Sequence, residues 1–319
     1  MKKKFLFAVL ALLVLAVCTS ATVSYPIPGT GKAGAASKVY FIKSISPAAL
    51  EKVYAALGRA PAGQDRVGVK VSTGEPPSSN YLRQDLIGSF VKSLKGTYIE
   101  CDTAYGGQRS ATAMHYQVAK DHGFEPIVLM DEKGDMSIPV KGGTRMKENI
   151  VGKAFPDYTF QVVLSHFKGH GMAGFGGALK NMSIGYGSGK NGKNLIHSGG
   201  GGKSWTRERP AFLEAMAEAA KSIVDYLGAD NYIYINVMNH MSVDCDCNGT
   251  PAKPTCKDLG IAASLDPVAL DKACLDLVWA APDTKDLKQR IENRNGALTV
   301  YHAAEIGLGN LEYELIELK

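Results

Sequence analysis

The stretch Tyr232-Ile-Tyr-Ile-Asn-Val237 (YIYINV) decides the fold class of this chain. It is almost wholly apolar and rich in β-branched and aromatic residues, which is typical of a strand buried in the middle of a sheet. A helical pattern precedes it at residues 209–228, with Pro210 near its start and Gly228 at its end. A helix that leads into a fully buried strand indicates the α/β class.

The same alternation of helix and strand patterns extends over the rest of the chain. Further strands are predicted at residues 39–42, 67–71, 98–101, 127–130 and 158–164, at Val300 and at 311–318. Further helices are predicted at residues 47–58, 79–95, 109–122, 266–279 and 284–293. No repeat of 20–50 residues is visible. We therefore predict one compact α/β unit over residues 38–319, with a mostly parallel sheet flanked by helices.

Composition and charge exclude several classes of protein. A chain of 319 residues with 45% hydrophobic and 21% charged content is neither intrinsically disordered nor a disulfide-stapled miniprotein. Its formal net charge is +5. Cleavage of residues 1–21, which have the pattern of a signal peptide described below, would remove Lys2, Lys3 and Lys4 and leave +2. Such a small charge does not provide the basic surface of a nucleic-acid-binding protein.

Residues 1–21 have the pattern of a signal peptide. Three lysines precede an apolar run from Phe5 to Val17, and small residues suited to cleavage follow. The run is shorter than the ~20 residues of a membrane-spanning helix. We therefore expect cleavage, export to the periplasm or the extracellular space, and no membrane span afterwards. The bulky Val17 before Cys18 disfavours a lipoprotein anchor, and the small, Pro/Gly-rich residues 22–37 predict a flexible tether.

Glycine is over-represented, and many glycines lie in residues 169–202. The chain has 35 glycines in 319 residues, about 11% against a usual ~7%. This stretch is interpreted as a loop after the strand at 158–164, and it overlaps the sequence Ser-His166-Phe-Lys168-Gly-His170. Because open α/β sheets bind ligands at the carboxyl ends of strands, His166, Lys168 and His170 are candidate catalytic residues. Two imidazoles four residues apart serve as metal ligands or acid–base groups; the alternative is solvated loop histidines.

A second group of reactive side chains follows YIYINV, in the sequence Asp244-Cys245-Asp246-Cys247. In extended backbone the two cysteines point to one side and the two aspartates to the other. Two thiolates placed in this way can hold one metal ion, with iron or zinc expected and Asp244 or Asp246 as further ligands. Two alternatives remain: a Cys247–Cys256 disulfide that closes a surface loop, or an acidic turn without a chemical role.

Several separated motifs occur together in one order along the chain. They are Gly68 to Pro76 (GVKVSTGEP), Asn80 to Arg83 (NYLR), Asp102 to Arg109 (DTAYGGQR), Leu164 to His170 (LSHFKGH), Gly177 to Asn181 (GALKN), Asp244 to Cys247 (DCDC) and Gly260 to Asp271 (GIAASLDPVALD). With these motifs the chain resembles the domain-of-unknown-function 362 family, often labelled uncharacterised iron–sulfur centre proteins. The resemblance covers nearly the whole chain after the signal peptide.

The resemblance implies an α/β domain and metal or iron–sulfur binding. Many family members carry a ferredoxin-like, cysteine-rich insertion. This chain departs from them, because no cysteine lies between Cys101 and Cys245. A [4Fe–4S] cluster normally needs four cysteine ligands. The resemblance therefore carries over the fold, the two-histidine loop and the Cys-Asp-Cys turn, but not the cluster.

Together these features predict an exported α/β protein with a metal-binding site, open to redox chemistry, whose reaction the residues do not specify. We expect Lys70, Arg109, Lys180 and Asn181 to bind a small molecule or anion beside that site. The alternative is a non-catalytic exported protein that holds a metal or an anion, with its cysteines in a structural disulfide.

Overall fold

The computed structural model describes residues 36–201, 204–206 and 208–319. The predicted signal peptide, residues 1–21, and all but the last two residues of the predicted tether, 22–37, lie outside them. The first strand, β1 (Ser37–Ile42), includes the last residue of that tether.

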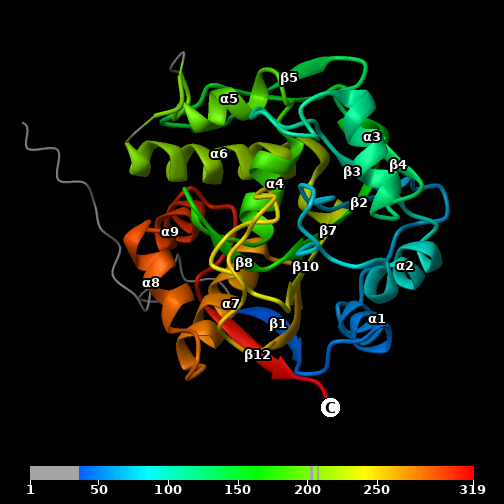
Figure 1. Cartoon of the computed structure of the whole chain (residues 1–319), viewed down its shortest axis with the longest axis vertical. Helices are drawn as coiled ribbons and strands as arrows, with labels where there is room; N and C mark the ends of the chain where they lie inside the picture. The colour runs from blue at the N-terminus through cyan, green and yellow to red at the C-terminus, as the bar shows by residue number, and fades with distance from the viewer. Residues whose placement is uncertain (1–35, 202–203, 207) are drawn as a thin grey trace, which may run out of the picture.

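An eight-stranded sheet forms the centre of the protein (Figure 1). Its order is β12-β1-β11-β10-β7-β2-β3-β4. These strands are β12 (Tyr313–Glu317), β11 (Gly260–Ser264), β10 (Tyr232–Met238), β7 (Phe160–His166), β2 (Val67–Lys70), β3 (Thr97–Glu100) and β4 (Ile127–Leu129). In this sheet five neighbouring pairs are parallel and two, both involving β11, are antiparallel. The predicted α/β class with a mostly parallel sheet is confirmed.

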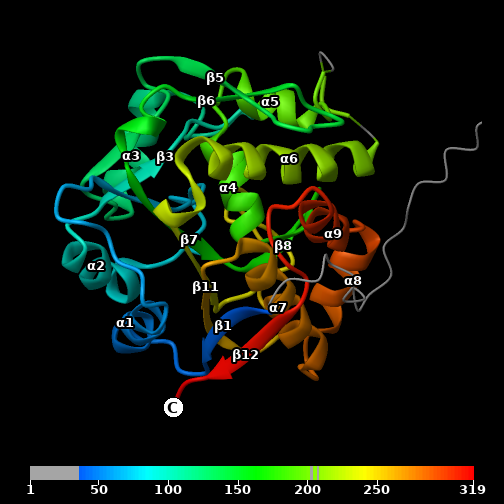
Figure 2. The same ribbon diagram turned by 180° about the vertical axis from the view of Figure 1, so that it is seen from behind.

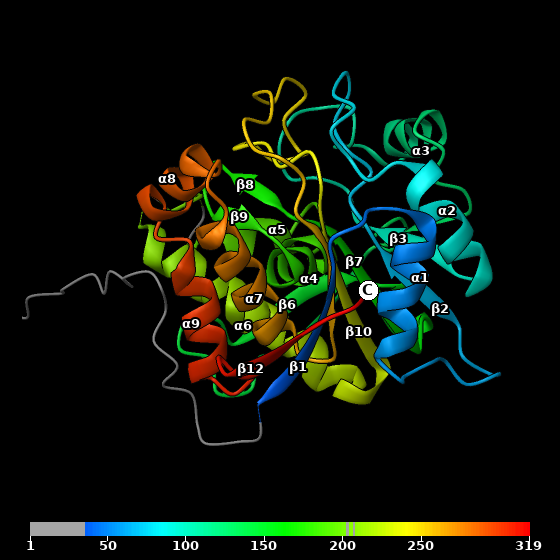
Figure 3. The ribbon, with the colours of Figure 1, turned by 90° about the horizontal axis from the view of Figure 1, so that it is seen from below.

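Helices cover both faces of this sheet, which lies between them in Figure 3. One face packs against α1 (Pro47–Ala56), α2 (Gln84–Ser93) and α3 (Thr112–Asp121). The other face packs against α4 (Ala178–Tyr186), α6 (Arg209–Leu227), α7 (Pro267–Ala280) and α9 (Ala297–Glu305). Helix α6 runs across α4 (Figure 2), and α5 (Gly192–His197) and α8 (Lys285–Asn293) complete this layer. The described residues form a single compact unit.

Strand β10 is the buried central strand that its sequence predicts. It lies between β7 and β11, and its seven residues are all buried. Ile233, Ile235 and Val237 pack on the face covered by α1 and α2, whereas Tyr232 and Tyr234 pack on the face covered by α4 and α7. Burying one such aliphatic side chain contributes about 1.5–3 kcal/mol. Both faces of β10 therefore stabilise the fold.

The glycine-rich residues 169–202 are not the loop that the sequence suggests. They include most of a hairpin of β8 (Lys168–His170) and β9 (Gly174–Gly176), followed by α4 and α5. Helix α4 forms because Asp271 in α7 accepts hydrogen bonds from the first backbone N–H groups of α4, at Ala178 (2.8 Å) and Leu179 (2.9 Å). A side chain at Gly177 would place its Cβ 2.3 Å from the Asp271 carboxylate, so only glycine permits this approach.

Other elements also differ from the sequence-based expectation. Val300 lies in helix α9 and not in a strand, because its contacts in the core outweigh the strand preference of a β-branched residue. The hairpin of β5 (Asp135–Pro139) and β6 (Glu148–Gly152) and strand β11 were not predicted. In the part of the chain that the structure describes, the helices are each too short or too polar to span a bilayer.

Candidate functional site

The loops after β2, β3, β7 and β10 surround a cavity of about 340 Å³. These four strands are parallel, so their carboxyl ends meet at one edge of the sheet, where α/β proteins place their ligands. Ten of the predicted site residues line the cavity: Lys70, Arg109, His166, Lys168, His170, Lys180, Asn181, Asp244, Cys245 and Cys247. Asp246 lies behind its wall, in contact with His166 and Lys168.

Three of these residues form a candidate metal-binding group. One ligand atom each from His170, Cys245 and Cys247 lies within 4.8 Å of the other two. The Sγ of Cys247 is 3.9 Å from the Nε2 of His170, and the backbone N–H of Cys247 donates to the Sγ of Cys245 at 3.4 Å. Two sulfurs and one imidazole are donors typical of zinc and iron sites.

The cysteines of the described residues are all free thiols. Cys247 faces the cavity, whereas the thiol of Cys256 donates to the backbone oxygen of Met241 at 3.7 Å. The disulfide between Cys247 and Cys256, considered from the sequence, is therefore not formed in this structure.

The two clustered thiols differ in their affinity for a proton. The pKa of Cys245 lies well below its usual value. The hydrogen bond with Cys247 and the charges of Lys180 and Lys168 lower it, and together they outweigh burial, which raises it. The same hydrogen bond and burial raise the pKa of Cys247. Lys180 places its Nζ 3.6 Å from the Sγ of Cys245. Cys245 is therefore the more acidic thiol of the pair.

His170 is oriented by the loop that follows it. Its Nδ1 accepts hydrogen bonds from the backbone N–H groups of Met172 (3.2 Å) and Ala173 (2.9 Å). A ring nitrogen that accepts carries no proton, so the proton of the neutral ring is on Nε2, which faces the thiols. Burial and the charge of Lys180 lower the pKa of His170 and so keep the ring neutral. In most metal-binding histidines the second nitrogen instead donates to an oxygen.

Asp246 is bound by the two other residues of the histidine motif. Its carboxylate is 2.8 Å from the Nδ1 of His166 and 2.9 Å from the Nζ of Lys168. Burial raises the pKa of Asp246, but the charges of His166 and Lys168 hold it below its usual value. The Nε2 of His166 donates to the backbone oxygen of Asn239 at 2.6 Å. Both nitrogens of His166 thus face oxygens, and the three residues fix the conformation of the Cys-Asp-Cys turn.

Asp244 is directed away from the two thiols. Its carboxylate pairs with Arg290 at 3.0 Å and accepts the backbone N–H of Ala252 at 3.0 Å. Neither aspartate of the turn therefore joins the group of His170, Cys245 and Cys247.

Lys70 and Asn181 join the cavity wall to the sheet. The Nζ of Lys70 donates to Asn181 at 3.0 Å and to the backbone oxygen of Val71. The amide of Asn181 in turn donates to the backbone oxygens of Lys70 (3.1 Å) and Leu164 (3.2 Å). Asn181 thereby links α4 to β2 and β7 through hydrogen bonds and orients the amine of Lys70.

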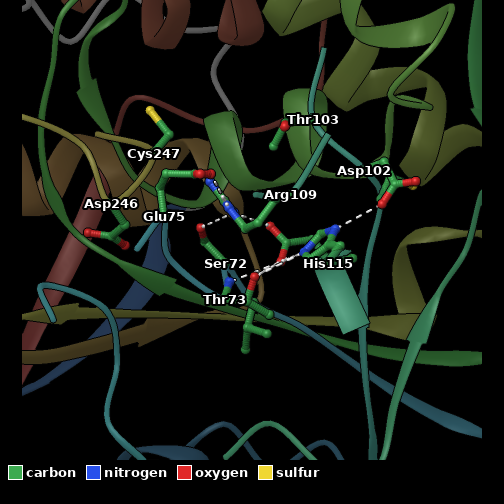
Figure 4. Close-up of polar contacts among 12 residues, drawn as sticks. Ser72, Thr73, Glu75, Asp102, Thr103, Arg109, His115, Asp246 and Cys247 are labelled. Atoms are coloured by element: carbon green, nitrogen blue, oxygen red, sulfur yellow. Dashed lines mark hydrogen bonds and ion pairs between the residues drawn. The ribbon is translucent and has the colours of Figure 1, made fainter. Parts of the chain in front are cut away.

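Arg109 lies in a buried network of charges beside the cavity (Figure 4). Its guanidinium pairs with Glu75 at 3.1 Å and with Glu100 at 3.2 Å, and it donates to the hydroxyl of Tyr105 at 2.6 Å. The charge of Arg109 is thus neutralised by protein carboxylates. We assign it a role in shaping the cavity wall.

The same network contains residues that sequence reasoning missed. The buried ring of His115 lies between Glu100 (3.2 Å) and Asp102 (3.0 Å), and Thr73 donates to Glu100 through its hydroxyl at 2.8 Å. Burial lowers the pKa of His115, but its bonds to Asp102 and Glu100 raise it above its usual value. Their position could have indicated them, because Glu100 and Asp102 lie at the carboxyl end of the strand predicted at residues 98–101, where α/β proteins place their sites.

Lys193 of helix α5 is a further cavity residue that the sequence did not reveal. It is buried, and its Nζ donates to the backbone oxygens of Gly187 (2.7 Å) and Cys101 (3.3 Å). The carbonyl of Lys193 accepts from the Nδ1 of His197 at 2.6 Å. The interpretation of residues 169–202 as a loop hid this pair, since helical spacing is what brings them together.

Comparison with known proteins identifies the family. The family model described as "Domain of unknown function (DUF362)" matches residues 67–276, and the chain belongs to this family. No curated protein matches the chain. Among the solved structures that match is the lactate racemase apoprotein from Thermoanaerobacterium thermosaccharolyticum, with 13% sequence identity and a TM-score of 0.42. The match covers 74% of this chain and 56% of that protein, so this chain spans little more than half its length.

Proposed function

We propose that this DUF362 chain is an exported metal-binding protein whose centre is the thiol pair of Cys245 and Cys247. The observation that carries the proposal is the convergence of these two thiols and His170, within 4.8 Å, on the wall of a cavity. Two chain segments far apart in sequence supply this wall: the continuous stretch of β8, β9 and α4, and the loop after β10.

The donor set favours zinc or iron over magnesium or calcium, which prefer oxygen. Three protein donors leave a fourth position of a tetrahedral ion open, as in catalytic zinc sites. Because His170, Cys245 and Cys247 line a cavity with charged and apolar side chains, an ion held by them would be accessible to a small molecule there. Bound iron would add redox chemistry.

A [4Fe–4S] cluster does not fit the residues at this site. The candidate group contains two cysteines, whereas such a cluster normally needs four. Cys101 and Cys274 are fully buried in the core, and Cys256 bonds to Met241. We derive no chemistry through a cluster.

The two thiolates are assigned as the main ligands and His170 as a weaker one. The Nδ1 of His170 accepts two backbone N–H bonds, so its proton is on Nε2. Metal binding through Nε2 requires the loss of this proton and a rearrangement of those bonds. Until then the Nε2–H group donates toward the thiols.

Metal analysis tests the proposal. Protein purified without added metal, and protein stripped and reloaded with zinc or with ferrous iron under anaerobic conditions, should contain one ion per chain. The Cys245→Ser/Cys247→Ser variant should lose the ion, and His170→Ala should weaken binding without abolishing it. Cys256→Ser, outside the group, is the matched control and should bind as the wild type does. Equal metal content in the wild type and the double serine variant would refute the assignment.

Export is the second part of the proposal and rests on the pattern of residues 1–21. When the full chain is expressed in a secreting bacterial host, we expect a processed form that begins at Thr22. Its intact mass, measured in periplasmic and membrane fractions, would reveal an uncleaved or lipid-modified chain if the expectation is wrong.

A further inference from the structure

Three lysine side chains on the cavity wall have no carboxylate partner among the residues that the structure describes. They are Lys70, Lys180 and Lys193. Lys70 is 1% exposed and Lys193 5%, and the ammonium groups of both donate only to neutral oxygens. The neighbouring Lys168, by contrast, pairs with Asp246 at 2.9 Å.

Buried ammonium groups without a counter-ion are costly, and folded proteins usually pair them. Each lysine carries three N–H donors. The carbonyl and amide oxygens named above take two donors of Lys70 and two of Lys193. One donor of each remains for a ligand in the cavity that both side chains line.

The three charges act on one another and so add to one positive potential. The pKa of Lys70 is lowered to about 8: burial and the charges of Lys193 and Lys180 lower it, and the charge of Glu100 raises it. Glu100 compensates Lys70 only in part, because its oxygens already accept from Thr73, from Arg109 and from His115.

Metal binding would leave this potential uncompensated. In the metal-free protein Lys180 faces the sulfur of Cys245 at 3.6 Å. Two thiolates bound to a divalent ion cancel its charge, so their negative charge no longer balances Lys180. The loaded cavity then presents three unmatched ammonium groups, which favour an anion with more than one negative charge.

The rest of the wall suits an organic body. Met172, Ile184 and Trp205 line the same cavity, and the indole of Trp205 stacks on His197 with ring centroids 4.0 Å apart. A volume of about 340 Å³ is at the lower end of the range for small-molecule sites.

We propose that the cavity binds a small organic dianion, with its charged groups on Lys70, Lys180 and Lys193 and its apolar part against Met172, Ile184 and Trp205. This inference deepens the proposed function and rests on it for the role of Lys180. Phosphate monoesters and dicarboxylates share the required chemistry.

Calorimetric titration at constant ionic strength tests the charge preference. Phenyl phosphate and succinate are the dianionic probes, benzoate and acetate the monoanions, and inorganic phosphate the dianion without an organic body. Metal-loaded protein should bind phenyl phosphate or succinate at least tenfold more tightly than either monoanion. The same probe should also bind more tightly than inorganic phosphate. Whichever of phenyl phosphate and succinate binds more tightly identifies the class. Equal affinity for dianions and monoanions would overturn the inference.

Variants identify the lysines and separate the two proposals. Lys70→Met and Lys193→Met should each weaken dianion binding at least tenfold while metal content, measured on the same samples, stays unchanged. The exposed Lys190→Met, between α4 and α5, is the matched control and should leave dianion binding unchanged. If the protein binds metal normally and the lysine substitutions leave its dianion affinity unchanged, the dianion site is refuted and the metal site is not. Preference for dianions in a wild type that binds no metal would support the dianion site and refute the metal site.

Discussion

At the residue scale, Gly185 determines where the amine of Lys70 lies. A Cβ at this position of α4 would lie 2.4 Å from the Cε and 2.5 Å from the Nζ of Lys70. Lys70 is a flexible side chain, so Gly185→Ala should displace its ammonium from Asn181 without disturbing the backbone of α4. We expect dianion affinity to fall about as far as in Lys70→Met, at least tenfold. Calorimetric titration of the purified variant measures this.

The matched control is Gly88→Ala in α2, where a Cβ approaches only Gln84, at 3.4 Å. Both substitutions favour the helix, by up to about 1 kcal/mol. Thermal unfolding should therefore show neither variant to be grossly destabilised. If Gly185→Ala binds dianions as the wild type does, the position of Lys70 is not important for the ligand.

Residues that share a short stretch of chain could be predicted as site residues, and residues that meet only in space could not. Cys245 and Cys247 are two positions apart, a spacing that would place both sulfurs on one side of an extended backbone and that made them candidates as a pair. The pairing of Arg109 with Glu75 spans 34 positions, and no local pattern indicates it. A lone glutamate in a sequence is usually solvated.

At the scale of elements, local patterns predicted those helices and strands that are stabilised by their own sequence. Helix α7 begins where Asp266 precedes Pro267, and the carboxylate of Asp266 accepts from the backbone N–H groups of Val268 and Ala269, as expected of an N-cap. Helix α4 has no such local cap. Its N-terminus is held by Asp271, more than 90 positions away. The sequence around α4 itself is rich in glycine and is typical of a loop. The helix that carries Lys180 and Asn181 was therefore missed although both residues were selected.

At the scale of the whole molecule, the sheet topology accounts for the position of the site. Parallel pairing of β2, β3, β7 and β10 brings the loops that follow these strands to one edge. The order of helices and strands in the sequence predicted this edge. It did not predict that β11 runs antiparallel to β10 and β1, because a short Gly/Ala-rich strand has no distinctive pattern.

Glu218 joins three parts of the molecule and should make its stability dependent on pH. This carboxylate of α6 accepts from the backbone N–H groups of Thr144 (2.7 Å) and Met146 (2.8 Å) and lies 3.4 Å from the Nε2 of His302 in α9. Burial raises its pKa, but the bonds to His302 and to these backbone groups lower it to about 2 from 4.5. This difference corresponds to about 3 kcal/mol.

The sign of the effect follows from the lowered pKa. Above the unfolded-state value of 4.5 the ionised Glu218 contributes its full stability, and this is lost as the pH falls through about 2. Glu218→Gln should lower the free energy of unfolding by about 3 kcal/mol at pH 7 and reduce its decrease between pH 4.5 and 2. Urea unfolding at several pH values measures both.

The control lies one turn earlier on the same helix. Glu214 pairs with the partly exposed Arg145 at 2.5 Å, and a surface pair of this kind contributes at most about 1 kcal/mol. Glu214→Gln should therefore change the free energy of unfolding little and leave its pH dependence as in the wild type. If Glu218→Gln loses no more stability than this control, the three parts of the molecule are held together by their apolar contacts and not by the buried carboxylate.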